Sequence, residues 1–332
     1  MRFGLFGGAK AKGGTALGAG DSHGYRDFIE YVIEAERFGF HSMFMVEHHF
    51  TGIGQVSASM TVLAYLAART SRIRLGTAVV VLPWHNPVLV AEQAATLDLL
   101  SGGRFDFGVG KGYRKSEFAG FCIPPEEAGD RFDEAMAVIR KAWTGEGRFS
   151  HQGKRWRYED IVVEPAPVQR PHPPLWMAAA SPDSVRRAAR EGYNLLLDQI
   201  ISVDQVARNI GLFREECARV GRVYDPMTVA VARALQLFHR EEERAAAIET
   251  RRRVVGVIGG IAKGPRQFRS IEEDDAPLLG LPEEVVARVE RLRAGGAAQI
   301  LLVDPNASVG NLRAFADAVM PAFAAPDAVA AE

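Results

Sequence analysis

The feature that most constrains the fold of this chain is an alternation of short β-branched or aromatic runs with longer amphipathic segments. Strands are expected at Arg2–Phe6, Ser42–Val46, Arg74–Val81, Arg104–Val109, Pro174–Ala178, Asn194–Leu197, Thr228–Leu235 and Ala298–Val303. Helices are expected at 25–38, 57–70, 87–100, 125–143, 182–191, 203–220, 241–255, 283–293 and 309–319. Such alternation is typical of a parallel sheet with crossover helices, and eight strands of this kind predict an α/β fold, the TIM (β/α)8 barrel.

The length of the chain agrees with one such barrel. With 332 residues, 47% of them hydrophobic, the chain can bury a large core. The gaps at 145–173 and 256–281 are longer than ordinary connections and are expected to be insertions at the barrel rim. The second is rich in glycine and charge, so it is either a mobile lid or a surface loop. We predict a single domain over 1–332 with two rim insertions.

The charge balance argues against a macromolecular or membrane partner. Lys and Arg total 40 and Asp and Glu total 41, so no whole-chain field attracts nucleic acid or an acidic membrane. The two cysteines are too few for a disulfide framework. The apolar N-terminal run is too short for a secretory signal, and no stretch approaches the roughly 18 apolar residues of a membrane span. A cytoplasmic protein acting on a small molecule is expected.

The second predicted strand ends in Glu47-His48-His49-Phe50, which places a carboxylate and two imidazoles where barrel enzymes carry their chemistry. Adjacent residues on an extended segment point to opposite sides, so His48 and His49 are not expected to share an ion, and no metal is predicted. Acid–base chemistry suits one such histidine, because its ordinary pKa lies near neutrality. A buried histidine bonded to the backbone remains the alternative for His49.

The third and fourth predicted strands end in small residues. Gly76–Pro83 would let a flat ring approach the backbone, although an interior barrel strand can look the same. Phe107–Tyr113 ends in spaced glycines and Lys111, which suits an anion. No helix clearly opens after this strand, so a dinucleotide-binding GxGxxG motif is disfavoured. A tight turn with a solvated lysine is the open alternative.

Ser181 and Pro182 follow the fifth predicted strand as an N-cap and a first helical residue. The free N–H groups of that helix and the hydroxyls of Ser181 and Ser184 would form a phosphate cradle, with Lys111 from the neighbouring strand. Asp183 would oppose a phosphate unless it points away. Simple helix capping explains Ser181 equally well.

Taken together, these motifs resemble the bacterial luciferase family. They are Glu47–Phe50, Gly76–Pro83 with Asn86–Val88, Ser101–Phe105 and Phe107–Tyr113. The resemblance implies a TIM barrel that receives reduced FMN (FMNH2) from a separate flavin reductase. It further implies a monooxygenase that inserts one atom of O2 into a small organic substrate through a C4a-hydroperoxyflavin, and a homodimer.

Matched by position, the resemblance also implies residue roles. His48 falls on the catalytic histidine, with His49 beside it in the pocket. Ala78 and Val79 fall on a pair joined by a cis peptide next to the flavin ring. Lys111, Ser181 and Ser184 fall on phosphate-contacting positions. The full set of expected cofactor contacts is Glu47, Ala78, Val79, Lys111, Tyr113, Ala180, Ser181 and Ser184.

The chain also departs from luciferase. Gly110 stands where luciferase has a reactive cysteine, Ala180 replaces a glutamate, and Asp198-Gln199 replace a Ser-Trp pair. Light emission from an aldehyde is therefore not expected, and the substrate stays unassigned. Two alternatives remain open: a dehydrogenase of this fold that uses the deazaflavin F420, and a non-catalytic flavin-binding subunit.

Overall fold

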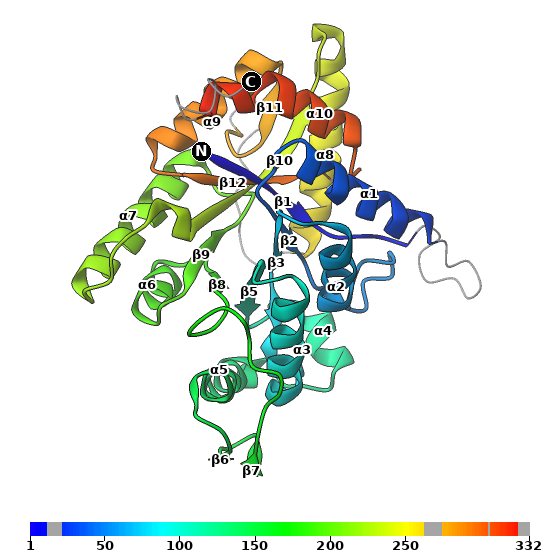
Figure 1. Cartoon of the computed structure of the whole chain (residues 1–332). Coiled ribbons are helices and arrows are strands. Elements are labelled where there is room, and N and C mark those ends of the chain that lie inside the picture. The colour runs from blue at the N-terminus through cyan, green and yellow to red at the C-terminus, as the bar shows by residue number, and fades with distance from the viewer. Residues whose placement is uncertain (12–21, 262–273, 305, 325–332) are drawn as a thin grey trace. The chain divides into compact units, whose positions relative to one another are not determined.

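The computed structural model describes the chain except for residues 12–21, 262–273, 305 and 325–332 (Figure 1). The strands of its main sheet follow the order β11-β10-β12-β1-β2-β3-β5-β8-β9, and β10 also pairs with β9. These strands are β1 Arg2–Gly7, β2 Ser42–Met45, β3 Arg74–Thr77, β5 Phe105–Gly110, β8 Leu175–Ala178, β9 Asn194–Leu197, β10 Val229–Leu237, β11 Leu278–Gly280 and β12 Gln299–Val303, and β4 Val80–Val81 pairs with β5 off this path. Without β11 and β4, eight parallel strands remain. The sheet closes into a barrel because β10 pairs with both β12 and β9. The predicted TIM barrel is confirmed.

Helices follow the strands as the amphipathic pattern predicted. They are α1 His23–Arg37, α2 Ser59–Arg69, α3 Pro87–Leu100, α4 Lys115–Gly120, α5 Ala128–Thr144, α6 Pro182–Arg190, α7 Val203–Arg219, α8 Arg244–Ile261, α9 Pro282–Ala294 and α10 Val309–Ala318. Asn86 caps α3, because its side chain accepts from the backbone N–H groups of Val88 and Leu89. Pro87 then occupies the first turn, where a missing N–H costs nothing.

Two details of the strand and helix pattern differ from the sequence-based expectation. The strand expected over Arg74–Val81 is divided into β3 and β4, on either side of a cis peptide bond between Ala78 and Val79. A helix does open after β5: α4 spans Lys115–Gly120. A helix of six residues is too short to show an amphipathic period in the sequence. It is stabilised by the burial of Glu117 and Phe118 in the folded protein.

Both expected insertions contain secondary structure that was not predicted. The region 145–173 forms an antiparallel hairpin of β6 Phe149–Gln152 and β7 Arg157–Ile161, which Figure 1 shows beyond α5 and away from β2, β3 and β5. Its backbone is held by Glu134 of α5, which accepts from the N–H groups of Arg155 and Trp156. The region 256–281 begins within α8 and includes β11. Residues 262–273 of this expected insertion lie outside the described residues.

Contacts divide the chain into two compact units, which are described separately. The central unit comprises Gly7–Ile33 and Ser42–Ala178, and the terminal unit comprises Met1–Phe6, Glu34–His41 and Ala179–Glu332. The single domain predicted over 1–332 stays a prediction.

A buried cluster ties together the strands of the central unit. A Cβ atom at Gly76 of β3 would lie 2.5 Å from the ring of Phe44, so only glycine fits beside this ring. Phe44 of β2 meets the Trp176 ring of β8 edge-on, with 5.2 Å between ring centroids. The Trp176 Nε1–H donates to Asp106 of β5, which also receives the Nε and Nη2 groups of Arg74 at 2.7 and 3.0 Å. These bonds lie toward the strand beginnings, where barrels carry stability.

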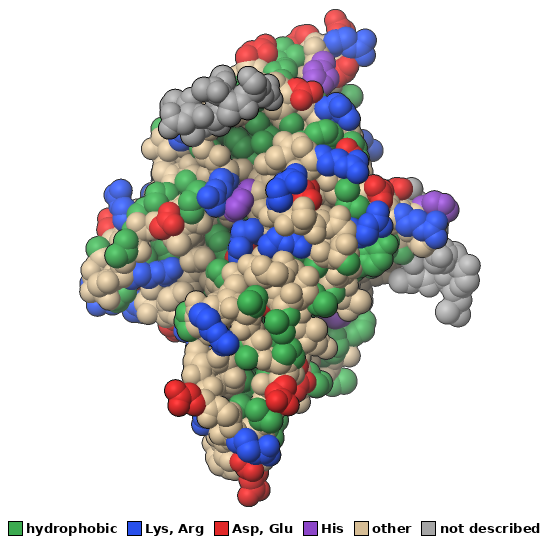
Figure 2. All heavy atoms as spheres, in the orientation of Figure 1, with side chains coloured by type: hydrophobic (Ala, Val, Ile, Leu, Met, Phe, Trp, Pro, Cys, Tyr) green, Lys and Arg blue, Asp and Glu red, His purple; other side chains and the backbone are tan. Residues whose placement is uncertain are grey.

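The surface carries both signs of charge. On the face shown in Figure 2, Lys and Arg side chains and Asp and Glu side chains are both present, in keeping with the balanced composition. Among the described helices, not one is long and apolar enough to cross a membrane.

Candidate functional site

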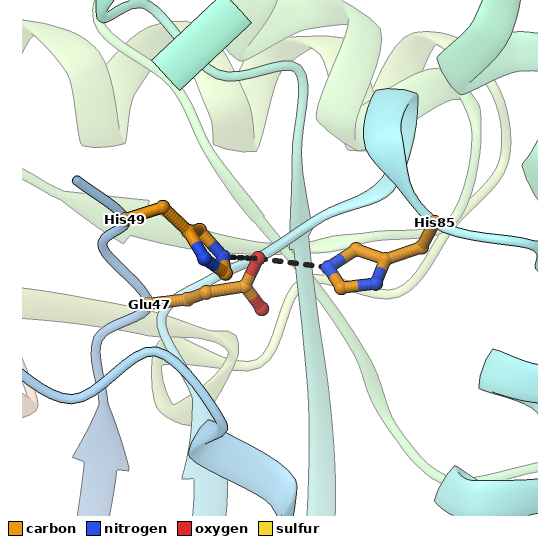
Figure 3. A group of neighbouring side chains, drawn as sticks. All are labelled: Glu47, His49 and His85. Atoms are coloured by element: carbon orange, nitrogen blue, oxygen red, sulfur yellow. Dashed lines mark hydrogen bonds and ion pairs between the residues drawn. The ribbon is translucent and has the colours of Figure 1, made fainter. Parts of the chain in front are cut away.

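Glu47 forms the centre of a polar cluster in the central unit, just past the end of β2 (Figure 3). Its side chain is buried, and its Oε1 accepts from His49 Nε2 at 3.2 Å and from His85 Nε2 at 2.8 Å. The indole Nε1–H of Trp84 donates to the same oxygen at 3.2 Å. The turn after β4 therefore supplies two of the three side-chain donors.

The donors around Glu47 keep it ionised. Burial alone would raise the pKa of this carboxyl, but hydrogen bonds and charge from His49 and His85 lower that pKa to about 2. A buried carboxylate is tolerable only when hydrogen bonds replace its water, and three side-chain donors do so here. Glu47 therefore acts as a fixed negative charge that holds both rings in place.

The same three residues could be taken for a metal site. One ligand atom each from Glu47, His49 and His85 lies within 4.8 Å of the others, which the sequence did not reveal because His85 is distant along the chain. In Figure 3, however, Oε1 lies between the two rings and receives both of their hydrogen bonds. The Trp84 N–H points at the same oxygen, and a cation there would face this positive donor. The arrangement favours a hydrogen-bonded carboxylate.

His48 faces a different carboxylate from the one that binds His49. Its Nδ1 lies 3.1 Å from Oε1 of Glu117, and the backbone N–H of His49 donates to the same oxygen at 2.9 Å. Glu117 lies on α4, and only 2% of its side chain is exposed. Because a carboxylate only accepts, Nδ1 carries the proton and Nε2 of a neutral His48 is left as the acceptor. Glu117 thus fixes both the tautomer and the ring orientation.

A cation lies at the other edge of His48. The Nη2 group of Arg114 is 3.4 Å from His48 Nε2. The Nε–H of Arg114 is buried and has no hydrogen-bond partner within the described parts of the chain. Negative charge at Glu117 and positive charge at Arg114 therefore lie on opposite sides of one imidazole. At Nε2, the guanidinium opposes a proton and favours a developing anion.

Aromatic side chains surround this polar group. Phe121 stacks on the Trp84 ring, with centroids 5.3 Å apart and planes at 18°, and meets the His49 ring edge-on at 4.8 Å. Phe118 of α4 meets the same indole at 5.0 Å. Phe50 is 60% exposed, although its ring is 5.0 Å from that of Phe121. An apolar wall therefore limits water around His49.

The expected flavin-facing positions of the central unit lie between β3 and β4 and just after β5. Ala78 and Val79 are half-buried and joined by the cis peptide that the resemblance implied. A Cβ atom at Gly110 would lie 2.5 Å from Cγ2 of Val79. Val79 therefore fills the space that a cysteine side chain at residue 110 would need.

Lys111 and Tyr113 follow β5. The Nζ of Lys111 lies 5.6 Å from the ring of Phe132 and has no carboxylate partner among the described residues, so its charge is available to an anion. Tyr113 is 63% exposed, and the guanidinium of Arg114 lies 5.8 Å from its ring.

Ser181 and Ser184 belong to the terminal unit, so their predicted partnership with Lys111 remains a prediction. The two serines form a capping box: Ser181 Oγ accepts from the Ser184 N–H, and Ser184 Oγ accepts from the Ser181 N–H. The capping role that the sequence left open is therefore present. Asp183 is fully exposed, and Ala180 is exposed beside the cap. The first turn of α6 is open to an anion.

A second unforeseen group in the terminal unit is centred on Arg233 of β10, whose side chain is completely buried. Its Nη1 donates to the backbone oxygens of Asp198 and Ala232 at 3.1 and 3.0 Å. Its Nε and Nη2 have no hydrogen-bond partner in the described chain. Each unmade bond of a buried donor costs about 1–3 kcal/mol. Burial lowers the pKa of Arg233 to about 10, against the opposing charge of Asp275, so the guanidinium stays charged at neutral pH.

Comparisons with known proteins agree with this architecture. Residues 1–324 match the family model described as luciferase-like monooxygenase. The chain therefore belongs to the luciferase-like monooxygenase family. A solved structure of the monooxygenase RslO1 from Streptomyces bottropensis is 28% identical, with a TM-score of 0.86 over 98% of this chain and 100% of that one.

Two curated relatives have named activities. The oxygenase component of a flavin-dependent trigonelline monooxygenase from Acinetobacter baylyi is 29% identical over 68% of this chain and 63% of that protein. Limonene 1,2-monooxygenase from Rhodococcus erythropolis is 26% identical over 89% of this chain and 80% of that protein. In three of the curated relatives the match spans only 50–63% of their length.

Proposed function

We propose that this protein is the oxygenase of a two-component, FMN-dependent monooxygenase acting on a small organic substrate. The observation that carries the proposal is the His48–Glu117 pair at the end of β2, with Arg114 at the opposite edge of the ring. Membership of the luciferase-like family supports the flavin, and a relative named as an oxygenase component supports a separate reductase. A cytoplasmic homodimer is part of the same proposal.

Residues of each unit have the chemistry that a flavin phosphate needs. Lys111 has no carboxylate partner within the described chain, and the first turn of α6 is exposed beside Ser181 and Ser184. These groups would hold the phosphate, and Glu47, Ala78, Val79, Tyr113 and Ala180 are proposed as further contacts to the cofactor. Reduced FMN, when bound, supplies the two electrons with which one atom of O2 enters the substrate and the other leaves as water.

The side chains of the central unit provide the proton chemistry. His48 presents Nε2 to the reacting group while Glu117 retains the proton on Nδ1. Arg114, whose Nε–H is unpaired within the described chain, stabilises negative charge beside that nitrogen. Glu47 orients His49 and His85, and Phe121 and Trp84 limit the water that would divert oxygen to hydrogen peroxide.

The deciding experiment combines the purified protein with FMN, NADH and a generic flavin reductase. Oxygen uptake and hydrogen peroxide release are measured while small organic substrates are screened for an oxygenated product. We expect FMN binding, and product formation at the expense of peroxide with the right substrate.

Reduced F420 is tested in parallel. Hydride transfer to or from F420 without oxygen uptake would replace the proposal by the dehydrogenase alternative. Absence of FMN and F420 binding would refute both.

A further inference from the structure

The buried guanidinium of Arg233 presents one complete hydrogen-bonding edge that nothing in the described chain occupies. Nε–H and one Nη2–H lie side by side on this edge and match the two oxygens of a carboxylate. Elsewhere in the protein the same edge is used for carboxylates. Arg74 places it on the two oxygens of Asp106 at 2.7 and 3.0 Å, and Arg251 places it on one oxygen of Asp274, Oδ2, at 3.1 and 2.9 Å. In Arg233 both atoms are unpaired.

The opposite side of the Arg233 guanidinium is anchored. Its Nη1 is held by the backbone oxygens of Asp198 and Ala232, which fixes the direction of the free edge. Asp198 directly follows β9, whose Leu197 pairs in register with Val231 of β10. The guanidinium therefore lies at the carboxyl end of β9. In barrels of this kind, ligands bind at that end of the strands.

Neighbouring carboxylates are committed to other groups. Asp274 accepts from Arg251, and Asp275 accepts from the Val203 N–H and from Arg291. One oxygen of Asp198 accepts from the Ile200 N–H. These acids offset the charge of Arg233 at a distance, but none of them bonds to its free edge in the described chain. A fully buried charged donor pair without a partner is rare and costly, and a ligand anion would complete it.

We propose that the Nε/Nη2 edge of Arg233 binds the carboxylate of the organic substrate, which assigns that substrate to the organic acids. This inference rests on the proposed monooxygenase function and narrows its substrate class. A neutral hydrocarbon or ketone would leave the guanidinium buried and unpaired, so Arg233 also selects against such molecules.

The test measures binding by calorimetry at fixed ionic strength, without flavin. Acetate, benzoate and phenylacetate are the probes, each compared with its neutral amide. We expect at least one acid to bind wild-type protein about tenfold or more tightly than its amide, because a charge-assisted pair contributes roughly 1.5–3 kcal/mol. Arg233→Lys keeps the charge, removes the two-pronged edge and should abolish most of this preference.

Arg222→Lys is the matched control. Arg222 is a partly buried arginine of the same unit that donates to the Tyr193 oxygen and to Asn194, so its replacement should leave the acid preference intact. If Arg233→Lys does not fold, the wild-type comparison in saturating FMN decides, because the proposed phosphate site at Lys111 is then filled. Equal binding of all three acids and their amides overturns the inference.

Repeating the titrations with saturating FMN shows whether Arg233 binds the substrate or the cofactor. Binding of the acids should persist; loss of binding would mean that the cofactor occupies Arg233, and the substrate assignment would fall. The two proposals fail separately. Oxygen uptake with reduced FMN but no preference for acids contradicts only the substrate class. A preference for acids without FMN binding contradicts only the monooxygenase function.

Discussion

Nδ1 of His48 lies 3.1 Å from Oε1 of Glu117, a carboxylate 69 residues away in sequence that is almost fully buried. Glu117 is shielded from solvent, and its bond is to Nδ1 of His48, not to Nε2, where the proposed proton transfer takes place. We infer that it acts by holding the His48 ring. The quality of the proposed proton transfer at Nε2 therefore depends on a residue of a short helix that no motif marks.

Replacing Glu117 with Gln should uncouple the proposed reaction. The amide oxygen can still accept from the His49 N–H and from Nδ1, but the negative charge that holds and polarises the His48 ring is lost. Product formation should fall about 10- to 100-fold, part of the roughly 10²–10⁴-fold that a positioned acid or base contributes, while peroxide release per O2 rises. Coupled oxygen and peroxide assays measure both. Glu126→Gln, an exposed neighbour, is the control; equal coupling in the two variants would contradict the role of Glu117.

Replacing Glu47 with Gln should lower stability in a pH-dependent way. The pKa of Glu47 is lowered from its ordinary value of 4.5 to about 2 in the folded protein by the hydrogen bonds and charge of His49 and His85. A lowered carboxyl pKa stabilises the fold above the unfolded-state value, and this contribution is lost as pH falls through the folded value. We expect a loss of about 2–3 kcal/mol at neutral pH that shrinks between pH 4.5 and about 2. Urea unfolding over this range tests it, and an equal loss at every pH would show that charge is not involved.

Metal removal should leave the Glu47 cluster intact. Because Oε1 of Glu47 already receives three side-chain donors, a chelator should change neither the unfolding temperature nor FMN binding. Elemental analysis of the purified protein should find no stoichiometric zinc. A chelator-induced drop in unfolding temperature that disappears in His85→Ala would reverse this reading and establish a metal site.

Gly110→Cys should destabilise the protein through a steric clash with Val79. The added Cβ would lie 2.5 Å from Cγ2 of that valine, and overpacking of this kind costs about 1–3 kcal/mol. The double variant with Val79→Ala should recover part of the loss, since the alanine frees the space. A double-mutant cycle on unfolding free energies measures the coupling, and strictly additive effects would argue against the contact.

Ser181→Ala separates the two roles considered for this serine. Loss of the cap alone should cost about 0.5–2 kcal/mol of unfolding free energy. If Ser181 also holds the phosphate, FMN affinity should fall while riboflavin affinity stays unchanged. Titrating both flavins against wild type and variant decides this; a parallel change in the two affinities would leave capping as its only role.

The sequence predicted the eight barrel strands well because strands buried on both faces read as continuous apolar runs. The β6–β7 hairpin was missed since Arg157–Ile161 is charged and largely exposed, without an apolar pattern. At the site, His48 and His49 stood out because they end a strand. Glu117 lies 69 residues from His48 along the chain, and His85 lies 38 residues from Glu47. Only the fold brings each of them to its partner. Arg233 did carry a signal, a single charge within the apolar run Val229–Leu235.

The lack of room between Val79 and a side chain at residue 110 also limits how this chain can change over time. A chain with valine at the first position loses stability on gaining a side chain at the second unless the valine is first replaced by something smaller. Substitutions at the two positions are therefore expected to occur in a set order. A laboratory lineage that tries to introduce a thiol beside the proposed flavin position should pass through residue 79 first.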